Sequence, residues 1–237
     1  MKSKVSTIVT TKNSSKTIEA LLKSIKEQSY YQNIEIIVVD NNSSDSTVKI
    51  AKKYTEKVFQ KGPERSIQRN YGVLKSTGDF ILILDADMVL TKKVVEECVN
   101  IINIEPYGAL IIPEKSFGEN FWAKVKAWER EINEGEDYFE AARFFPKKII
   151  EEFKGYEEDL TGPEDWDLPQ KISKKYKIGR IKSYIFHNEG KTSIINLMKK
   201  KYYYGLSADR YLKKQNLSPI TAKTIYFLRP AFYKNWF

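Results

Sequence analysis

The sequence predicts an α/β fold in which a mainly parallel β-sheet is flanked by helices. Apolar segments and helical patterns alternate about every 20–25 residues over the first half of the chain. The clearest apolar segment, Phe80-Ile-Leu-Ile-Leu84, is typical of a strand that is buried on both faces. Polar clusters follow three of the apolar segments, at the edge where parallel sheets bind ligands. A Rossmann-like sheet with a site at that edge is therefore expected.

Further strands and helices are expected on either side of this central segment. Strands are predicted at residues 5–9, 34–39, 58–59, 109–113, 141–145 and 184–186. Helical spacing predicts helices over 18–25, 50–54, 65–74, 92–104, 121–128 and 168–172, the third with Tyr71 and Leu74 on its apolar side. Two parts are expected: a domain over 1–190, with halves meeting near residue 113, and a helical tail over 191–237.

The composition fits a folded domain that does not depend on cysteine chemistry. Hydrophobic residues make up 41% of the 237 residues and aromatic residues 13%, which excludes global disorder. The single cysteine, Cys98, lies in an apolar helical pattern, so a disulfide framework or a cysteine-based metal site is excluded. No signal peptide and no apolar run of about 20 residues is present, so a cytoplasmic, soluble or peripheral protein is expected.

The charge is distributed unevenly along the chain. The net charge is +9, but residues 171–237 hold 16 Lys and Arg against only Glu189 and Asp209. Residues 1–170 hold 24 Lys and Arg against 29 Asp and Glu. A mildly acidic body with a strongly basic tail indicates an anionic partner.

Two carboxylates stand where the central strand ends, at Asp85 and Asp87. In an extended backbone these side chains point to the same face and converge. Like charges this close favour a cation between them, and Mg²⁺ or Mn²⁺ carrying phosphates suits oxygen ligands. The alternative is a solvated strand end whose acids cap the next helix.

The second half adds another acidic cluster and the only histidine. Glu164, Asp165 and Asp167 follow a Gly-Pro turn at the start of a helix. A helix N-terminus favours one acid in its first turn, but three are less well explained in this way. His187 ends a predicted strand, and it is either a structural residue or a ligand.

Taken together, these segments resemble the family 2 glycosyltransferases, inverting enzymes with the GT-A fold. The resemblance covers nearly all of residues 4–190, and its five motifs occur in the order of the family. They are Val9-Thr-Thr-Lys-Asn13, Val38-Val-Asp40-Asn-Asn-Ser-Ser-Asp45, Arg69-Asn70-Tyr-Gly72 with Thr77-Gly78-Asp79, Asp85-Ala-Asp87, and Gly162-Pro-Glu164-Asp165.

The resemblance implies a role for each of these positions. Residues 1–113 would bind a UDP- or GDP-linked sugar and residues 114–190 the acceptor, with Mn²⁺ or Mg²⁺ as cofactor. Asp40 would hold the base. Asp85 would face the ribose and metal, Asp87 would bind the metal, and His187 matches a further ligand position. Asp165 would be the general base, with Glu164 shaping the acceptor pocket. The remaining expected nucleotide-sugar contacts are Thr10, Lys12, Asn13, Asn42, Arg69 and Ala86, although Lys12 replaces a frequent aromatic residue.

Three other classes of protein share some of these features. A Rossmann oxidoreductase needs a glycine-rich turn after the first strand, and residues 10–15 contain no glycine. A nucleotidyltransferase of sugar phosphates would also bind nucleotide and metal, but its glycine-rich N-terminal loop is absent. A non-enzymatic nucleic-acid-binding protein would explain the basic tail but not the acids, so no nucleic-acid partner is expected.

The tail combines lysines with aromatic residues. Lys199-Lys200-Lys201 adjoins Tyr202-Tyr203-Tyr204, and the sequence closes on Trp236-Phe237. Such a composition suits the surface of an anionic membrane. The tail is therefore expected to dock the domain on the inner face of the cell membrane, near a lipid-linked or cell-surface glycan acceptor. A homodimer contact, the start of a further element, and a core-packed helix with solvated lysines are the alternatives.

Overall fold

The computed structural model describes residues 2–135, 140–160 and 162–214, and within the last range the side chains of 206–210 and 214 are not described. The closing aromatic segment with Trp236 and Phe237 lies outside the described residues. Among the described residues, no helix is both long enough and apolar enough to cross a membrane.

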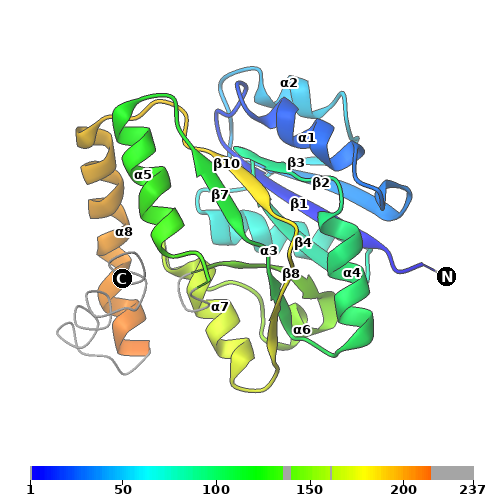
Figure 1. The fold of residues 1–237 in the computed structure, drawn as a ribbon. Helices are drawn as coiled ribbons and strands as arrows, with labels where there is room; N and C mark the ends of the chain where they lie inside the picture. Colours follow the sequence, from blue (N-terminus) through cyan, green and yellow to red (C-terminus); the bar gives the residue numbers. More distant parts are fainter. Residues whose placement is uncertain (1, 136–139, 161, 215–237) are drawn as a thin grey trace.

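A seven-stranded sheet forms the centre of the molecule (Figure 1). Its spatial order is β3 (Val58–Gln60), β2 (Ile34–Asp40), β1 (Val5–Thr11), β4 (Phe80–Asp85), β8 (Ala142–Pro146), β6 (Ala109–Ile111) and β9 (Ile178–Arg180). The first four strands are mutually parallel, and β8 runs antiparallel to both of its neighbours. The predicted strands are confirmed, except that the strand expected over 109–113 ends at Ile111.

Helices cover both faces of this sheet. They are α1 (Ile18–Lys26), α2 (Thr47–Ala51), α3 (Arg65–Lys75), α4 (Val94–Ile104), α5 (Phe121–Ile132), α6 (Lys147–Glu152), α7 (Glu164–Ser173) and α8 (Ile194–Lys214), with a short 3₁₀ turn at Tyr31–Asn33. Along β4, Leu82 and Leu84 pack in one core with α1 and α4, whereas Ile81 and Ile83 pack in the other with α6 and α7. The prediction that this strand is buried on both faces is confirmed.

A second, three-stranded sheet was not predicted. It pairs β5 (Met88–Leu90) with β10 (Ile185–Asn188), and β10 with β7 (Glu114–Phe117). The β5–β10 pair is antiparallel and the β10–β7 pair is parallel. This small sheet brings the residues around Asp87, Glu114 and His187 together, although they are far apart in the sequence.

A buried carboxylate, Glu35, ties the start of β2 to its neighbours. It accepts hydrogen bonds from Lys57, Ser6 and Thr77. Burial alone would raise the pKa of Glu35, but these hydrogen bonds outweigh it and lower the pKa to about 2.

The stability that Glu35 contributes should therefore depend on pH. Because its pKa is lowered by folding, the contribution is present above the ordinary pKa and is lost as the pH falls toward about 2. We expect Glu35→Gln to lower the free energy of unfolding at pH 7, with a gap to wild type that narrows below about pH 4. Urea unfolding at several pH values measures this gap, and a gap independent of pH would contradict the assignment.

Candidate active site

A cleft of about 780 Å³ opens at the carboxyl ends of β1 and β4. Residues from both of these strands line it, and α5 and α8 contribute further lining residues. Figure 1 shows α5 and α8 side by side at the same end of the molecule. Of the predicted site residues, the cleft is lined by Thr10, Lys12, Asp85, Ala86, Asp87, Asp165 and His187. The site thus forms at the predicted edge of the sheet.

Asp85 ends β4 and is held by a hydroxyl and two arginines. Thr10 donates a hydrogen bond to Asp85 Oδ1 over 3.0 Å, and Arg69 Nη2 lies 3.3 Å from the same oxygen. Arg143 Nη2 lies 3.6 Å from Oδ2. Burial would raise the pKa of Asp85, but the two guanidinium groups hold it well below its usual range. Asp85 is therefore an ionised carboxylate whose two oxygens already face cations.

Asp87 lies next to His187 rather than next to the partners of Asp85. Residues 86–87 form a turn, so the expected extended backbone, with both acids on one face, is wrong. The β5–β10 pairing sets His187 opposite Met88, and His187 Nε2 lies 3.3 Å from Asp87 Oδ2. The other ring nitrogen, Nδ1, lies 2.9 Å from Glu114 Oε2. Burial would lower the pKa of His187, but the contacts with Asp87 and Glu114 raise it to about 9.

The Asp87–His187 pair would fit a divalent cation that is shared with a phosphate, provided that His187 releases its Nε2 proton to the solvent when the cation binds. Among the described residues, no side chain or backbone group hydrogen-bonds to Asp87 Oδ1, so this carboxylate oxygen is left for a ligand. Within the described ranges, no group of three or more His, Cys, Asp or Glu side chains is arranged to hold a metal. Mg²⁺ and related ions at phosphate sites take one or two protein ligands, with phosphates and water completing the shell. The structure thus brings Asp87 and His187 together but does not add Asp85 to them as a third ligand.

Arg69 is the buried centre of the site. Its side chain is fully buried, and its Nη1 donates to Asp165 Oδ1 over 2.5 Å. Glu164 Oε1 lies 3.7 Å from the same nitrogen, and the ring of Tyr156 stacks at 5.0 Å. The next residue, Asn70, exchanges two hydrogen bonds of 2.8 Å with the backbone of Tyr156. The Arg-Asn pair therefore binds α3 to the segment that leads into α7.

The three acids at the start of α7 have different surroundings. Asp165 keeps 20% of its side chain exposed and lines the cleft. Glu164 is buried, with Arg65 Nη2 at 3.3 Å, and burial together with the charge of Asp165 raises its pKa. Asp167 is buried and pairs with Lys171 at 2.7 Å. Asp165 is thus the acid of this turn that can meet a substrate.

Gly162 allows the turn before these acids. Its φ is +103°, a conformation that side chains rarely adopt, and a Cβ atom there would lie 2.8 Å from Tyr204 Cβ. Both constraints require glycine. As a result, α8 can approach the start of α7 closely.

The loops after β1 and β2 differ in part from the expectation. Asp40 is fully buried, and its oxygens accept hydrogen bonds from the backbone and hydroxyl of Ser43. Asp40 thus stabilises the loop after β2 through Ser43 and does not line the cleft. The next residue, Asn41, lines the cleft instead. Asn13 and Asn42 adopt left-handed turns with φ of 49° and 50°, and neither lines the cleft. Contacts of Asp40, Asn13 and Asn42 with a nucleotide remain predictions.

Sequence reasoning missed several charged residues of the site. Glu114 joins three cationic groups: Arg143 at 2.5 Å, Arg130 at 2.6 Å and His187. Arg143 sits within an otherwise apolar strand, which is the one signal in the sequence that marks it as a paired buried charge. Glu114 and Arg130 carry no comparable local signal, because their partners come from other elements.

The chain is similar to known proteins over most of its length. Residues 6–156 match the family described as glycosyl transferase family 2. The chain is 32% identical over 122 residues to the poly(ribitol-phosphate) beta-N-acetylglucosaminyltransferase TarS of Staphylococcus aureus, covering 47% of this chain and 21% of TarS. It is 29% identical over 181 residues to a GalNAc(5)-diNAcBac-PP-undecaprenol beta-1,3-glucosyltransferase of Campylobacter jejuni, covering 68% and 57%. The chain thus spans less than two thirds of the length of either relative.

Solved structures show the same fold. The crystal structure of S. aureus TarS 1–349 in complex with UDP-GlcNAc matches with a TM-score of 0.64 at 23% identity, covering 80% of this chain and 60% of that one. The mannosyltransferase PcManGT from Pyrobaculum calidifontis, in complex with GDP-Man and Mn²⁺, matches with a TM-score of 0.63 at 20% identity, covering 79% and 57%. The fold is therefore the GT-A fold that the sequence predicted. The chain belongs to glycosyl transferase family 2.

Proposed function

We propose that this protein is an inverting glycosyltransferase that moves a sugar from a nucleoside-diphosphate sugar to an acceptor hydroxyl in one metal-assisted displacement. This proposal is supported by one observation: two separate functional groups lie in the same cleft. The Asp87–His187 pair, with its unpartnered carboxylate oxygen, suits a cation on the donor diphosphate. Asp165 is a partly exposed carboxylate on another element of the same cleft.

A single displacement requires this division of roles. Negative charge builds on the departing diphosphate, and a divalent cation bound there would stabilise it. The attacking hydroxyl must lose its proton on the opposite face of the sugar, which suits a positioned carboxylate such as Asp165. Arg69 bonds one oxygen of Asp165 and so fixes the orientation of this carboxylate.

The substrates of similar proteins indicate which donor and acceptor classes to propose for this chain. Matching structures are complexes with UDP-GlcNAc and with GDP-Man and Mn²⁺, which supports a UDP- or GDP-linked donor and Mn²⁺ or Mg²⁺ as the cofactor. A C. jejuni relative is named for a lipid-linked acceptor and TarS for a poly(ribitol-phosphate) acceptor. A lipid-linked or cell-surface glycan acceptor is therefore the substrate class that we propose.

Donor binding with and without Mn²⁺ tests this function. A thermal-shift panel of nucleotide sugars should identify a donor that stabilises the protein by about 2.7 kcal/mol at 100 times its Kd. Asp87→Ala should lose the Mn²⁺-dependent part of this stabilisation and the turnover, but should keep its fold, because its side chain is 42% exposed. Asp79→Ala, which removes an acid before β4, is the control. Unchanged Mn²⁺-dependent binding in the Asp87 variant would exclude this metal site.

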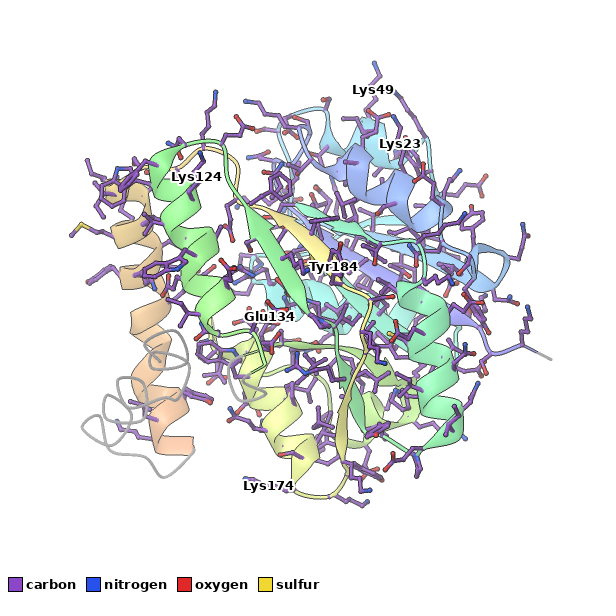
Figure 2. The ribbon with its side chains drawn as sticks, viewed as in Figure 1. Lys23, Lys49, Lys124, Glu134, Lys174 and Tyr184 are labelled. Carbon is purple, nitrogen blue, oxygen red and sulfur yellow. The ribbon has the colours of Figure 1, made fainter. Side chains whose placement is uncertain are left out.

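We also propose that the protein is cytoplasmic and docks on the inner face of the cell membrane. Helices α5 and α8 both expose large apolar side chains, among them Trp128 at 61% and Tyr202 at 74% exposure. The spacing of Phe121, Val125 and Trp128 places them on one face of α5. Exposed lysines accompany them, including Lys124, which Figure 2 labels near the upper end of α5, and Lys199. Cations beside exposed aromatic rings suit an anionic lipid surface.

Co-sedimentation with liposomes tests the docking proposal. Wild type should bind anionic but not neutral vesicles, and less as the salt concentration rises. The variant Trp128→Ser/Tyr202→Ser should bind several-fold more weakly, with donor binding unchanged, because neither residue lines the cleft. A concentration-dependent dimer that the same substitutions dissociate would indicate instead that this face joins two copies. Equal recovery with both vesicle types would exclude the membrane role.

A further inference from the structure

Three cationic side chains from separate elements line the cleft near Tyr204 of α8, and two of them contact its ring. Arg65, at the first position of α3, donates a hydrogen bond to Tyr204 Oη over 3.0 Å, and its guanidinium group lies 5.6 Å from the centre of the Tyr204 ring. Lys200 Nζ lies 5.6 Å from the centre of the same ring. Lys126 of α5 lines the same cleft. We define these three residues as the Tyr204 cation cluster.

The nearby carboxylates pair with only two of the three cations of this cluster. Arg65 pairs with Glu164, and Lys126 pairs with Glu189. Glu189 is also shared with Arg130 at 2.9 Å, so one carboxylate serves two cations. Lys200 makes no ion pair with any carboxylate in the part of the chain that the structure describes.

Lys126 and Lys200 lie close enough that, besides burial, the positive charge of Lys200 lowers the pKa of Lys126. The side chain of Lys126 is only 18% exposed. Its burial, and then the positive charge of Lys200, lower the pKa of Lys126. Two positive charges close together at a partly buried position raise the free energy of the folded protein. An anion bound between them would offset this cost.

We propose that the Tyr204 cation cluster is a binding subsite for a phosphate group of the acceptor. The oxygens of a phosphate group can accept hydrogen bonds from a guanidinium group and from flexible ammonium groups. Lipid diphosphates and polyol phosphodiesters both contain such phosphate groups. Two of the three cations stand on α5 and α8, and Arg65 contacts Glu164 beside Asp165. The donor diphosphate is assigned to the cation at the Asp87–His187 pair, which includes none of these three residues. The assignment to the acceptor rests on the proposed glycosyl transfer, whereas binding of phosphate does not.

Calorimetric titration with inorganic pyrophosphate in EDTA tests the subsite without turnover. EDTA removes divalent cations and so suppresses binding at Asp87. Wild type should bind pyrophosphate, more weakly as salt rises. We expect about a tenfold loss of affinity in Lys200→Gln and a larger loss in Lys126→Gln/Lys200→Gln, the scale of one lost charged contact. Lys199→Gln removes a neighbouring charge that does not line the cleft, and it should bind as wild type does.

Thermal unfolding of each variant checks that the fold is retained. Equal pyrophosphate affinity in Lys199→Gln and in Lys126→Gln/Lys200→Gln would overturn the subsite. Dimethyl phosphate, titrated in the same way, separates the two sources of phosphate. Binding of the diester at similar affinity supports a phosphodiester acceptor, and selective binding of pyrophosphate supports a lipid diphosphate.

Steady-state kinetics then assign the subsite to one substrate. With an acceptor sugar bearing a phosphate, Lys200→Gln should raise the KM of that acceptor about tenfold and leave the KM of the donor unchanged. With the same sugar as an uncharged alkyl glycoside, the variant and wild type should have equal KM. A raised donor KM in Lys200→Gln would show that the cluster serves the donor diphosphate and would overturn the acceptor assignment. A wild type that binds pyrophosphate in EDTA but transfers no sugar would contradict the proposed function and leave the anion site standing.

Discussion

Replacing Asp165 with asparagine is expected to lower kcat by about 10²–10⁴ while the affinity for the donor stays near that of wild type, since this is the usual share of general-base catalysis. Asparagine keeps an oxygen that can accept the hydrogen bond from Arg69, which Asp165 receives over 2.5 Å. The local geometry should therefore survive, and only the ability to take a proton is lost. Donor binding by thermal shift and single-turnover transfer measure the two effects separately.

Asp167→Asn is the matched control for this experiment. It makes the same change in the same turn of α7, but Asp167 pairs with Lys171 and does not line the cleft. Its kcat should stay within a few-fold of wild type. If Asp165→Asn loses donor affinity and keeps its rate, Asp165 binds substrate and is not the base.

The parts of the fold that the sequence predicted well are those with strong local patterns. The strand at Phe80–Leu84 is continuous in apolar residues because both of its faces are covered by helices. The small sheet left little trace, because its strands have three or four residues and form by pairing with distant segments. Glu114 and His187 are 73 residues apart, and only the β7–β10 pairing makes them neighbours.

In helix α3, the hydrophobic pattern of the sequence predicts the wrong buried side, because functional polar residues occupy that side. Leu74 was expected on the apolar side of this helix, and that prediction is wrong, since the residue is 73% exposed. The buried side instead carries Gln68, Arg69 and Gly72. A Cβ atom at Gly72 would lie 2.4 Å from Ile8, so this helix packs closely on β1 with Arg69 directed into the site. Sites that bury polar groups against the sheet break the usual rule of apolar faces.

The motif residues themselves were found, but their roles depend on burial that a sequence does not show. Asp40 and Asp165 are both acids within motifs, yet Asp40 is fully buried against Ser43 and Asp165 lines the cleft. The neighbour Asn41 lines the cleft beside the loop that Asp40 supports. A shift of one residue along a turn changes which side chain can contact a ligand. The geometry of the turn depends on tertiary packing, which the sequence does not show.

Replacing Arg69 with methionine is expected to lower the free energy of unfolding by about 3–5 kcal/mol at pH 7, the usual cost of removing one partner from a buried ion pair. The guanidinium group is fully buried and faces Asp85, Glu164 and Asp165, at 3.3, 3.7 and 2.5 Å. Methionine fills a similar volume, so the loss reports the charge and not a cavity. Urea unfolding measures it, with Lys75→Met as the control, because Lys75 is an exposed cation of the same helix and should change stability by less than about 0.5 kcal/mol.

The pH dependence of this loss identifies its origin. In wild type, Arg69 and Arg143 hold the pKa of Asp85 well below its usual range, so the stability that this ion pair contributes is present above the ordinary carboxylate pKa and is lost only as the pH falls far below it. In Arg69→Met the carboxylates can accept protons at higher pH, which removes the uncompensated charge. The gap between variant and wild type should therefore narrow as the pH falls below about 4. Adding Asp165→Asn to Arg69→Met should recover part of the loss at pH 7, because one of the stranded charges is then gone. A loss that is equal at pH 7 and pH 3 and is not reduced by Asp165→Asn would mean that Arg69 stabilises the fold by packing on Tyr156 and not by its charge.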